Sequence, residues 1–218
     1  MQQFAIIGLS SFGFYLAKGL VNKNCQVLAI DNNEEKIEEI KPFVHEAVIA
    51  DATEKDTLSS LGLKDMDVVV VSLGNKIDSS ILVTLYLKEF GVKNIIVKAL
   101  SDDHGRILQK LGATKVIFPE RDMALKLAGS LSSPNILDYL PLAPSYSIIE
   151  MAPPPGFVGK TLGELDLRNK YGVQVIVIKG LVPEKVILVP TAQYTIKDSD
   201  ILVTLGKNDD LEKLQNLK

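Results

Sequence analysis

A glycine-containing turn near the N-terminus is the first segment of this chain that could bind a ligand. Residues 8–13 have the sequence Gly-Leu-Ser-Ser-Phe-Gly and lie between a short apolar run and a run with helical spacing. In a dinucleotide-binding turn, the first glycine makes the turn, the second lets the backbone approach phosphate, and the third lets the helix pack on the strand. Gly8 and Gly13 hold the outer positions, whereas Ser10 replaces the middle glycine. The segment predicts a phosphate-binding turn at the start of a helix.

Polar residues follow the next three apolar runs of the chain. Asp31 ends the second run, where a carboxylate would accept hydrogen bonds from both hydroxyls of an adenosine ribose. Asp51 and Thr53 follow the third run, and Ser72 follows the fourth. The carboxyl ends of parallel strands share one edge of a sheet, so these residues are expected around one ligand site. Two other roles stay open, because Asp31 could cap a helix that begins near Asn33, and Asp51 could cap one that begins near Thr53.

Residue sets that catalyse reactions are missing from the sequence. Neither His45 nor His104 has a cysteine or a second histidine nearby, and none of the six tyrosines precedes a lysine by four positions. The sequence has no Gly-x-Ser-x-Gly segment. Residues 156–161, Gly-Phe-Val-Gly-Lys-Thr, lack the spacing of a P-loop and instead predict a turn in which Thr161 caps a short helix. The sequence therefore predicts nucleotide binding without catalysis.

The elements that position these residues alternate regularly through the first part of the chain. Short β-branched runs that are apolar on both faces predict strands of a parallel sheet covered by helices. The expected strands span 4–8, 26–31, 47–50, 68–72, 94–98 and 116–118, and the expected helices span 13–21, 34–40, 55–61, 77–90, 102–111 and 121–131. Strand–helix units in series predict an α/β fold with a doubly wound, Rossmann-like parallel sheet.

A change of composition divides the chain after the last of these helices. Serines and prolines from 132 to 144 predict a linker at 133–144, between an N-terminal domain of 1–132 and a C-terminal domain of 145–218. The C-terminal domain is expected to be small and α+β, with strands at 148–151, 173–179, 186–189 and 201–205 and helices at 161–165 and 209–217. A domain of about 75 residues buries little surface alone, so we expect it to pair with a second copy.

Composition and charge argue against several classes of protein. The 218 residues are 46% hydrophobic and 23% charged, as in ordinary folded proteins. With 24 basic and 27 acidic side chains the net charge is −3, and the absence of any run of Lys or Arg argues against a nucleic-acid partner. Cys25 is the single cysteine, so no disulfide can form within the chain, and a reducing cytoplasm is expected. No apolar run approaches the roughly 20 residues that span a membrane, and no signal peptide is expected.

Taken in order along the chain, these segments resemble the Trk/Ktr family of potassium-uptake regulatory subunits. The segments that carry the resemblance are 8–13, Leu28-Ala-Ile-Asp31, Ala50-Asp-Ala-Thr53, Ile96-Val-Lys-Ala99, 111–120 (Leu-Gly-Ala-Thr-Lys-Val-Ile-Phe-Pro-Glu) and Gly159-Lys-Thr-Leu162. The first part is similar to the RCK domain, the regulator of potassium conductance. The second part is similar to the small C-terminal domain that follows it, so the resemblance covers almost the whole chain.

The resemblance implies a cytoplasmic regulatory subunit without enzymatic activity. Subunits of this family form an octameric ring of dimers, made of one kind of subunit or of paralogous kinds, beneath a potassium-translocating membrane subunit of the Trk/Ktr type. Binding of an adenine nucleotide changes the conformation of the ring and thereby gates the membrane subunit. The chain is therefore expected at the inner face of the cell membrane, held there by its partner.

The resemblance also implies a set of nucleotide-binding residues by position. They are Gly8, Ser10, Ser11, Phe12, Gly13, Asp31, Asn32, Asp51, Ala52, Thr53, Ser72, Leu73, Lys98 and Glu120. Within this set, Asp31 would bind the ribose and Lys98 would offer a cation. Glu120 would lie near the phosphates or bind a divalent cation at a dimer interface.

The chain departs from the family at the phosphate-binding turn. Many members have Gly-Leu-Gly-Arg-Phe-Gly there, whereas this chain has Ser10 and Ser11. Loss of the arginine removes a charge-assisted contact to a terminal phosphate, so ATP, ADP, AMP and NAD(H) all stay open as ligands. In the C-terminal domain, Asp166, Arg168 and Asn169 could bind a second ligand such as cyclic di-AMP, or they could be solvated turn residues.

Two other functions compete with this interpretation. An NAD(P)-dependent oxidoreductase would need a catalytic His, Lys or Tyr that faces a nicotinamide. A nucleotide-sensing redox regulator of transcription would need a winged-helix domain and a basic face. The sequence provides neither set of features.

Overall fold

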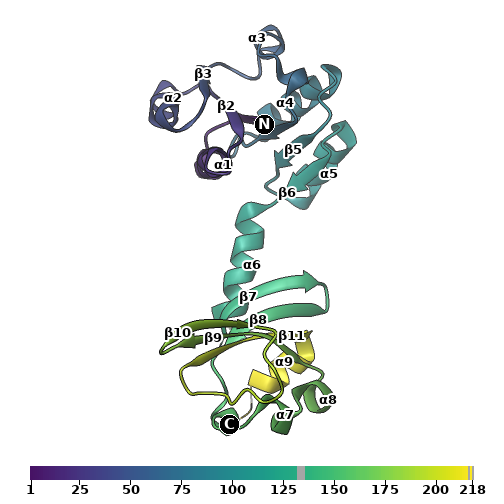
Figure 1. Ribbon diagram of the computed structural model, residues 1–218. Coiled ribbons are helices and arrows are strands. Elements are labelled where there is room, and N and C mark those ends of the chain that lie inside the picture. The colour runs from purple at the N-terminus through teal and green to yellow at the C-terminus, as the bar shows by residue number, and fades with distance from the viewer. Residues whose placement is uncertain (132–135, 216, 218) are drawn as a thin grey trace. The chain divides into compact units, whose positions relative to one another are not determined.

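The computed structural model describes residues 1–131, 136–215 and 217. The chain divides into two compact units, Met1–Pro119 and Glu120–Lys218 (Figure 1). Separate hydrophobic clusters fill the two units, so each has a core of its own.

A parallel six-stranded sheet forms the centre of the first unit. Its strands are β1 (Gln3–Ile7), β2 (Gln26–Asp31), β3 (Glu46–Ile49), β4 (Val68–Val71), β5 (Ile95–Lys98) and β6 (Lys115–Ile117). The order in the sheet is β3-β2-β1-β4-β5-β6, so the direction of winding changes between β1 and β4. This topology confirms the predicted doubly wound α/β sheet.

Helices cover both faces of this sheet. They are α1 (Ser11–Val21), α2 (Glu34–Ile40), α3 (Lys55–Ser59), α4 (Ile77–Glu89) and α5 (Asp102–Leu111), with 3-10 turns η1 (Lys41–Phe43) and η2 (Leu63–Asp65). Successive residues of β1 pack on opposite faces: Ile6 lies in a cluster with Ile37 of α2, and Ile7 lies in a cluster with Leu87 of α4. Burial on both sides explains why the strands are continuous apolar runs.

An antiparallel five-stranded sheet forms the centre of the second unit, in the order β10-β9-β11-β8-β7. Its strands are β7 (Ile136–Ala143), β8 (Tyr146–Met151), β9 (Gln174–Leu181), β10 (Glu184–Leu188) and β11 (Asp200–Lys207). The other elements are α6 (Pro119–Leu131), η3 (Pro155–Phe157), α7 (Leu162–Leu165), α8 (Leu167–Tyr171) and α9 (Asn208–Gln215). Leu165, Leu167 and Leu211 of the last three helices pack against Ile178 and Leu202 of the sheet. This unit confirms the predicted small α+β fold.

The boundary between the units differs from the sequence-based expectation. Residues Ile136–Ala143 form strand β7, which corrects the predicted linker at 133–144; positions 133–135 of that linker lie outside the described residues. The proline at 141 is tolerated because β7 is an edge strand, and its register shifts between Pro141 and Ala143. Helix α6 groups with the second unit, whereas a boundary at 132 places it in the first.

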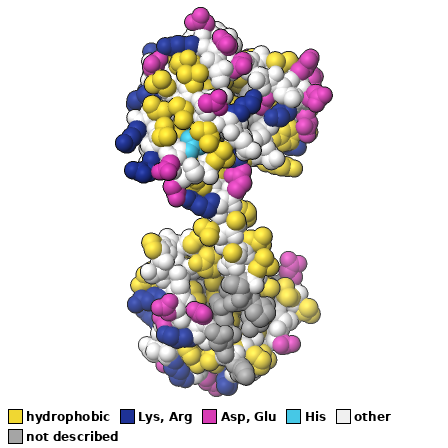
Figure 2. Space-filling view, turned by 180° about the vertical axis from the view of Figure 1, so that it is seen from behind, with side chains coloured by type: hydrophobic (Ala, Val, Ile, Leu, Met, Phe, Trp, Pro, Cys, Tyr) yellow, Lys and Arg dark blue, Asp and Glu magenta, His cyan; other side chains and the backbone are white. Residues whose placement is uncertain are grey.

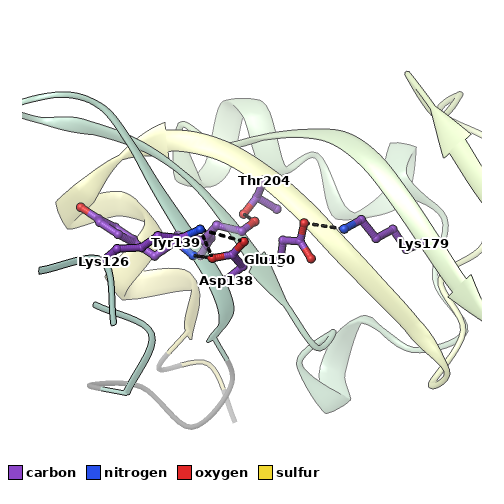
Figure 3. Close-up of polar contacts among 7 residues, drawn as sticks. Lys126, Asp138, Tyr139, Glu150, Lys179 and Thr204 are labelled. Carbon is purple, nitrogen blue, oxygen red and sulfur yellow. Dashed lines mark hydrogen bonds and ion pairs between the residues drawn. The ribbon is translucent and has the colours of Figure 1, made fainter. Parts of the chain in front are cut away.

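Charged side chains of the second unit pair with one another (Figure 3). Lys126 of α6 lies 3.0 Å from Asp138 of β7, and its hydrogen bond holds the pKa of the Asp138 carboxyl below its ordinary value. Lys179 of β9 forms an ion pair with Glu150 of β8 across the intervening strand β11. These contacts tie α6 to the sheet and link strands that are not neighbours.

Candidate functional site

The carboxyl ends of β1, β2, β3 and β4 surround a cavity of about 260 Å³, called the strand-end cavity below. It lies where the winding direction changes, which is where open α/β sheets bind ligands. The predicted site residues that line it are Gly8, Ser10, Asp31, Asn32, Asp51, Ala52, Thr53, Ser72 and Leu73. Four adjacent strand ends therefore bring most of the predicted set together.

Two glycines shape the turn between β1 and α1. Gly8 has a φ of +93°, and a Cβ atom there would lie 2.4 Å from the carbonyl oxygen of Ser72. A Cβ atom on Gly13 would lie 2.1 Å from the carbonyl oxygen of Gly8. Non-bonded atoms do not approach so closely, so the turn and the helix reach their positions only because these residues lack side chains.

Helix α1 begins beside the strand-end cavity. The N–H groups of Ser11, Phe12 and Gly13 belong to its first turn and have no acceptor within the helix. The Ser10 side chain does not cap them, because its hydroxyl shares a hydrogen bond of 2.7 Å with the Ser72 hydroxyl. First-turn N–H groups and the positive end of the helix dipole favour an anion such as phosphate. Ser11, Phe12 and Gly13 are not among the residues that line the cavity.

Asp31 is nearly buried, with 8% of its surface exposed, yet it lines the cavity. Its Oδ2 accepts from the backbone N–H of Leu9 at 2.6 Å, its Oδ1 accepts from that of Asn33 at 2.9 Å, and the ammonium of Lys36 lies 3.6 Å from Oδ2. Asn33, not Asp31, caps α2, so the capping role considered for Asp31 is wrong. Each carboxylate oxygen has further lone pairs, which could accept ribose hydroxyls from the cavity side.

Asp51 is exposed, lines the cavity after the neighbouring strand β3, and stays ionised. It accepts from the backbone N–H of Thr53 at 2.9 Å and from the Thr53 hydroxyl at 2.6 Å. These bonds, the hydroxyl first, lower the pKa of the Asp51 carboxyl. Helix α3 begins at Lys55 with Glu54 in the capping position, so the capping role considered for Asp51 is also wrong.

The structure adds lining residues that the sequence did not indicate. Asn33 and Lys36 come from the start of α2, and Lys76 and Ser79 come from the segment that follows β4. Lys76 and Ser79 could have been found from the same rule that gave Ser72, because they follow the same strand end. Lys36 lies in the first turn of α2, three residues after the capping residue Asn33, and has no such local signal.

Besides Ser11, Phe12 and Gly13, two more predicted residues do not line this cavity. Lys98 ends β5, is buried, and does not line the strand-end cavity. Glu120 belongs to the second unit. In the part of the chain that the structure describes, no three His, Cys, Asp or Glu side chains are placed to hold a metal ion. A role of Glu120 in binding a divalent cation therefore stays a prediction.

His104 is a buried structural residue of the first unit. Its Nδ1 accepts from the backbone N–H of Leu100 at 3.3 Å, and its Nε2 lies 2.9 Å from the Ser80 hydroxyl. The Ser80 hydroxyl donates to the carbonyl of Ile77, so Nε2 carries the ring proton and donates to Ser80. Burial lowers the pKa of His104, which keeps the ring neutral. Both ring nitrogens are therefore engaged: Nε2 joins α5 to α4, and Nδ1 holds the segment that leads into α5.

A second, shallower hollow lies in the second unit. It measures about 240 Å³, and the predicted residues Asp166 and Arg168 line it. Asn169 donates to Asp166 at 2.7 Å and so holds that carboxylate rather than lining the hollow.

Thr161 caps α7 in a reciprocal capping box with Glu164, which confirms the predicted cap and excludes a P-loop at this turn.

Among the described residues, no helix combines the length and the apolar character that crossing a membrane requires.

Family models match both units of this chain. The TrkA-N domain matches residues 4–119, and the TrkA-C domain matches residues 146–218. The Ktr system potassium uptake protein C of Bacillus subtilis is 40% identical over 214 residues, which cover 98% of this chain and 96% of the relative. The Ktr system potassium uptake protein A of Vibrio alginolyticus is 38% identical over 217 residues, covering 99% of this chain and 98% of the relative.

Solved structures share the fold at low sequence identity. The GsuK channel superposes with a TM-score of 0.70 at 19% identity, over 99% of this chain and 39% of that chain. The TrkA-N domain of the inner membrane protein ybaL from Escherichia coli superposes with a TM-score of 0.51 at 18% identity, over 57% of this chain and 91% of that chain.

Proposed function

This chain belongs to the family of Ktr and Trk potassium uptake proteins with TrkA-N and TrkA-C domains, and from that premise we propose that it is a regulatory subunit without enzymatic activity. It binds an adenine nucleotide in the strand-end cavity and gates a potassium-translocating membrane subunit. It works in the cytoplasm and reaches the inner face of the membrane through that partner.

The arrangement around Asp31 is the observation that carries this proposal. A nearly buried carboxylate lies at the end of β2, next to the glycine turn and the first turn of α1. A ribose at Asp31 would place its phosphates by the N–H groups of α1. The adenine would lie toward Ala52, which is buried and lines the same cavity as the apolar side chains of Ile7 and Ile30.

Regulation requires that the nucleotide favour one conformation of an assembly over another. We propose an octameric ring of dimers, formed with copies of this chain or with a paralogous subunit. Its support here is apolar surface: Met123, Leu125 and Leu131 of α6 are each more than 60% exposed, and Figure 2 shows hydrophobic side chains at the surface of the second unit. Exposed apolar surface on this scale is typical of an interface.

A second ligand, such as cyclic di-AMP in the hollow lined by Asp166 and Arg168, stays a prediction.

The proposal is tested by the nucleotide that the protein itself retains. We expect mass spectrometry of material released from the purified chain to show an adenine nucleotide. Titration calorimetry with AMP, ADP, ATP and NADH would then rank the ligands. Potassium flux into vesicles that contain the membrane subunit should change with the nucleotide added, and a chain that binds none of the four would contradict the proposal.

A further inference from the structure

Two lysines line the strand-end cavity, and their surroundings differ. The ammonium of Lys36 lies 3.6 Å from Asp31, so the charge of Lys36 is balanced by a nearly buried carboxylate. Lys76 is exposed, and none of the ion pairs among the described residues includes it. The hydrogen bonds from Thr53 are the main cause of the lowered pKa of Asp51, and the charge of Lys76 adds the smallest contribution. Asp51 is itself held by Thr53, so Lys76 can approach a ligand without breaking a contact.

Lys76 also stands at a second helix N-terminus beside the same cavity. It occupies the capping position of α4, its carbonyl accepts from the N–H of Ser80 at 3.1 Å, and its side chain makes no capping bond. Ser79, in the first turn of α4, lines the cavity too, whereas Asp78 of that turn does not. The cavity is therefore flanked by the starts of α1 and α4, with the Ser10–Ser72 hydrogen bond joining the two sides.

The phosphate-binding turn itself supplies no cation. Ser11 is uncharged, and its side chain does not line the cavity. Lys98 is buried and does not line it either. Of the cations on the described walls of the cavity, this leaves Lys76 as the one that is not paired with a carboxylate.

We propose that Lys76 binds the phosphate chain of the nucleotide and sets the preference of the site for phosphorylated over unphosphorylated adenosine. This inference rests on the proposed nucleotide site and names the residue that determines its charge specificity. A lysine offers a flexible point charge rather than a fixed fork of donors. Its contribution therefore depends on charge, is reduced by salt, and does not require one fixed geometry of the phosphates.

Calorimetric titration of the intact chain with adenosine and ADP would test the proposal. In Lys76→Met we expect ADP to bind about tenfold more weakly, as for loss of one charge-assisted contact, while adenosine binds within about twofold of the unaltered chain. Lys76→Arg, which keeps the charge, should retain most of the ADP affinity. Lys93→Met is the matched control. Lys93 precedes β5, at the amino ends of the parallel strands and away from the cavity, so its substitution should change neither affinity.

The outcomes separate this inference from the proposed function. Equal weakening of adenosine and ADP in Lys76→Met, or no weakening of either, would overturn the role of Lys76 while leaving a nucleotide site in place. Failure of the unaltered chain to bind either ligand would overturn the proposed function and this inference together. A salt series gives a further check, because ADP affinity should fall more steeply with NaCl in the unaltered chain than in Lys76→Met.

Discussion

The two units of this chain differ in where the polar side chains of their sheets lie. In the first unit, polar residues after β1, β2, β3 and β4 gather around one cavity. In the second, charged side chains pair with each other, as Lys126 does with Asp138 and Lys179 with Glu150. The difference follows from strand direction, because all carboxyl ends of a parallel sheet lie at one edge, whereas those of an antiparallel sheet alternate between two edges. A parallel sheet thus concentrates loops at a site, and an antiparallel sheet disperses them.

The exposed apolar side chains show a second contrast. In the second unit, strands β7 and β10 lie at the two edges of the sheet and expose Leu137, Leu140, Val186 and Leu188 by more than half. Strands at the centre of the first sheet are covered on both faces, as in β4, where Val69, Val70 and Val71 are buried. The first unit is therefore suited to hold a small ligand, and the second to meet another protein surface.

The largest expected effect comes from breaking the turn that builds the cavity. Gly13→Ala would place a Cβ atom 2.1 Å from the backbone oxygen of Gly8. We expect it to destabilise the first unit by about 2–4 kcal/mol, since backbone must shift. Hydrogen exchange should show lost protection in β1 and α1 and unchanged protection in β9 and β11. Gly19→Ala in the same helix meets no atom within 4 Å and should be neutral or stabilising.

A smaller effect is expected from the ribose-binding carboxylate. Asp31→Ala removes an acceptor for Leu9, Asn33 and the ribose hydroxyls. Nucleotide affinity should fall by about 1–3 kcal/mol. Calorimetry with AMP, ADP, ATP and NADH measures this, with Asp65→Ala, in the η2 turn before β4, as the control for loss of one acidic charge. Unchanged affinity for all four ligands would show that the ribose does not lie at Asp31.

An added cation at the start of α1 should make the cavity of the first unit more selective for nucleotides with long phosphate chains. Ser11→Arg adds a cation to the first turn of α1 and should raise the ATP-to-AMP affinity ratio about fivefold, or about 1 kcal/mol. Competition titrations with and without Mg²⁺ measure the ratio. Asn22→Arg adds the same charge at the other end of α1 and should leave the ratio unchanged. An unaltered ratio in Ser11→Arg would place the phosphates away from this helix.

The smallest effect is expected in the second unit. Lys126→Met removes the partner of the half-exposed Asp138, and screening by water limits the loss at pH 7 to about 0.5 kcal/mol. Because the folded-state pKa of Asp138 is lowered, the contribution is present above the ordinary value of 3.8 and disappears as pH falls through the folded pKa. Urea unfolding at pH 7 and pH 3 measures it, with Lys185→Met as the control. A loss of the same size at both pH values would indicate packing rather than charge.

The sequence predicted the first unit better than the second for a physical reason. Strands such as β2 and β4 are buried on both faces, so nearly all of their residues are apolar and the sequence alone indicates a buried strand. Strand β7 was missed because the proline at 141 favours a loop locally, and only its place at the sheet edge permits a strand.

The site residues, too, could be predicted from the sequence only where a local pattern marks them. Asp31 and Ser72 were found because they end strands, whereas Lys36 reaches the cavity from inside a helix. Lys98 shows the converse, since it ends a strand and yet does not line the cavity. Local spacing indicates which edge a residue joins but not how far its side chain extends or which neighbours cover it.

The hydrogen bond between Ser10 and Ser72 can run in either direction, which would not be possible with a glycine at position 10 because glycine has no hydroxyl group. Either hydroxyl can be the donor, at a fixed oxygen separation of 2.7 Å. Two protons serve one shared bond, so one proton remains for a third group, and it sits on Ser10 or on Ser72 according to the direction of that bond. Rotation of two hydroxyl hydrogens, without movement of any heavy atom, therefore transfers a donor from the α1 side of the cavity to the β4 side.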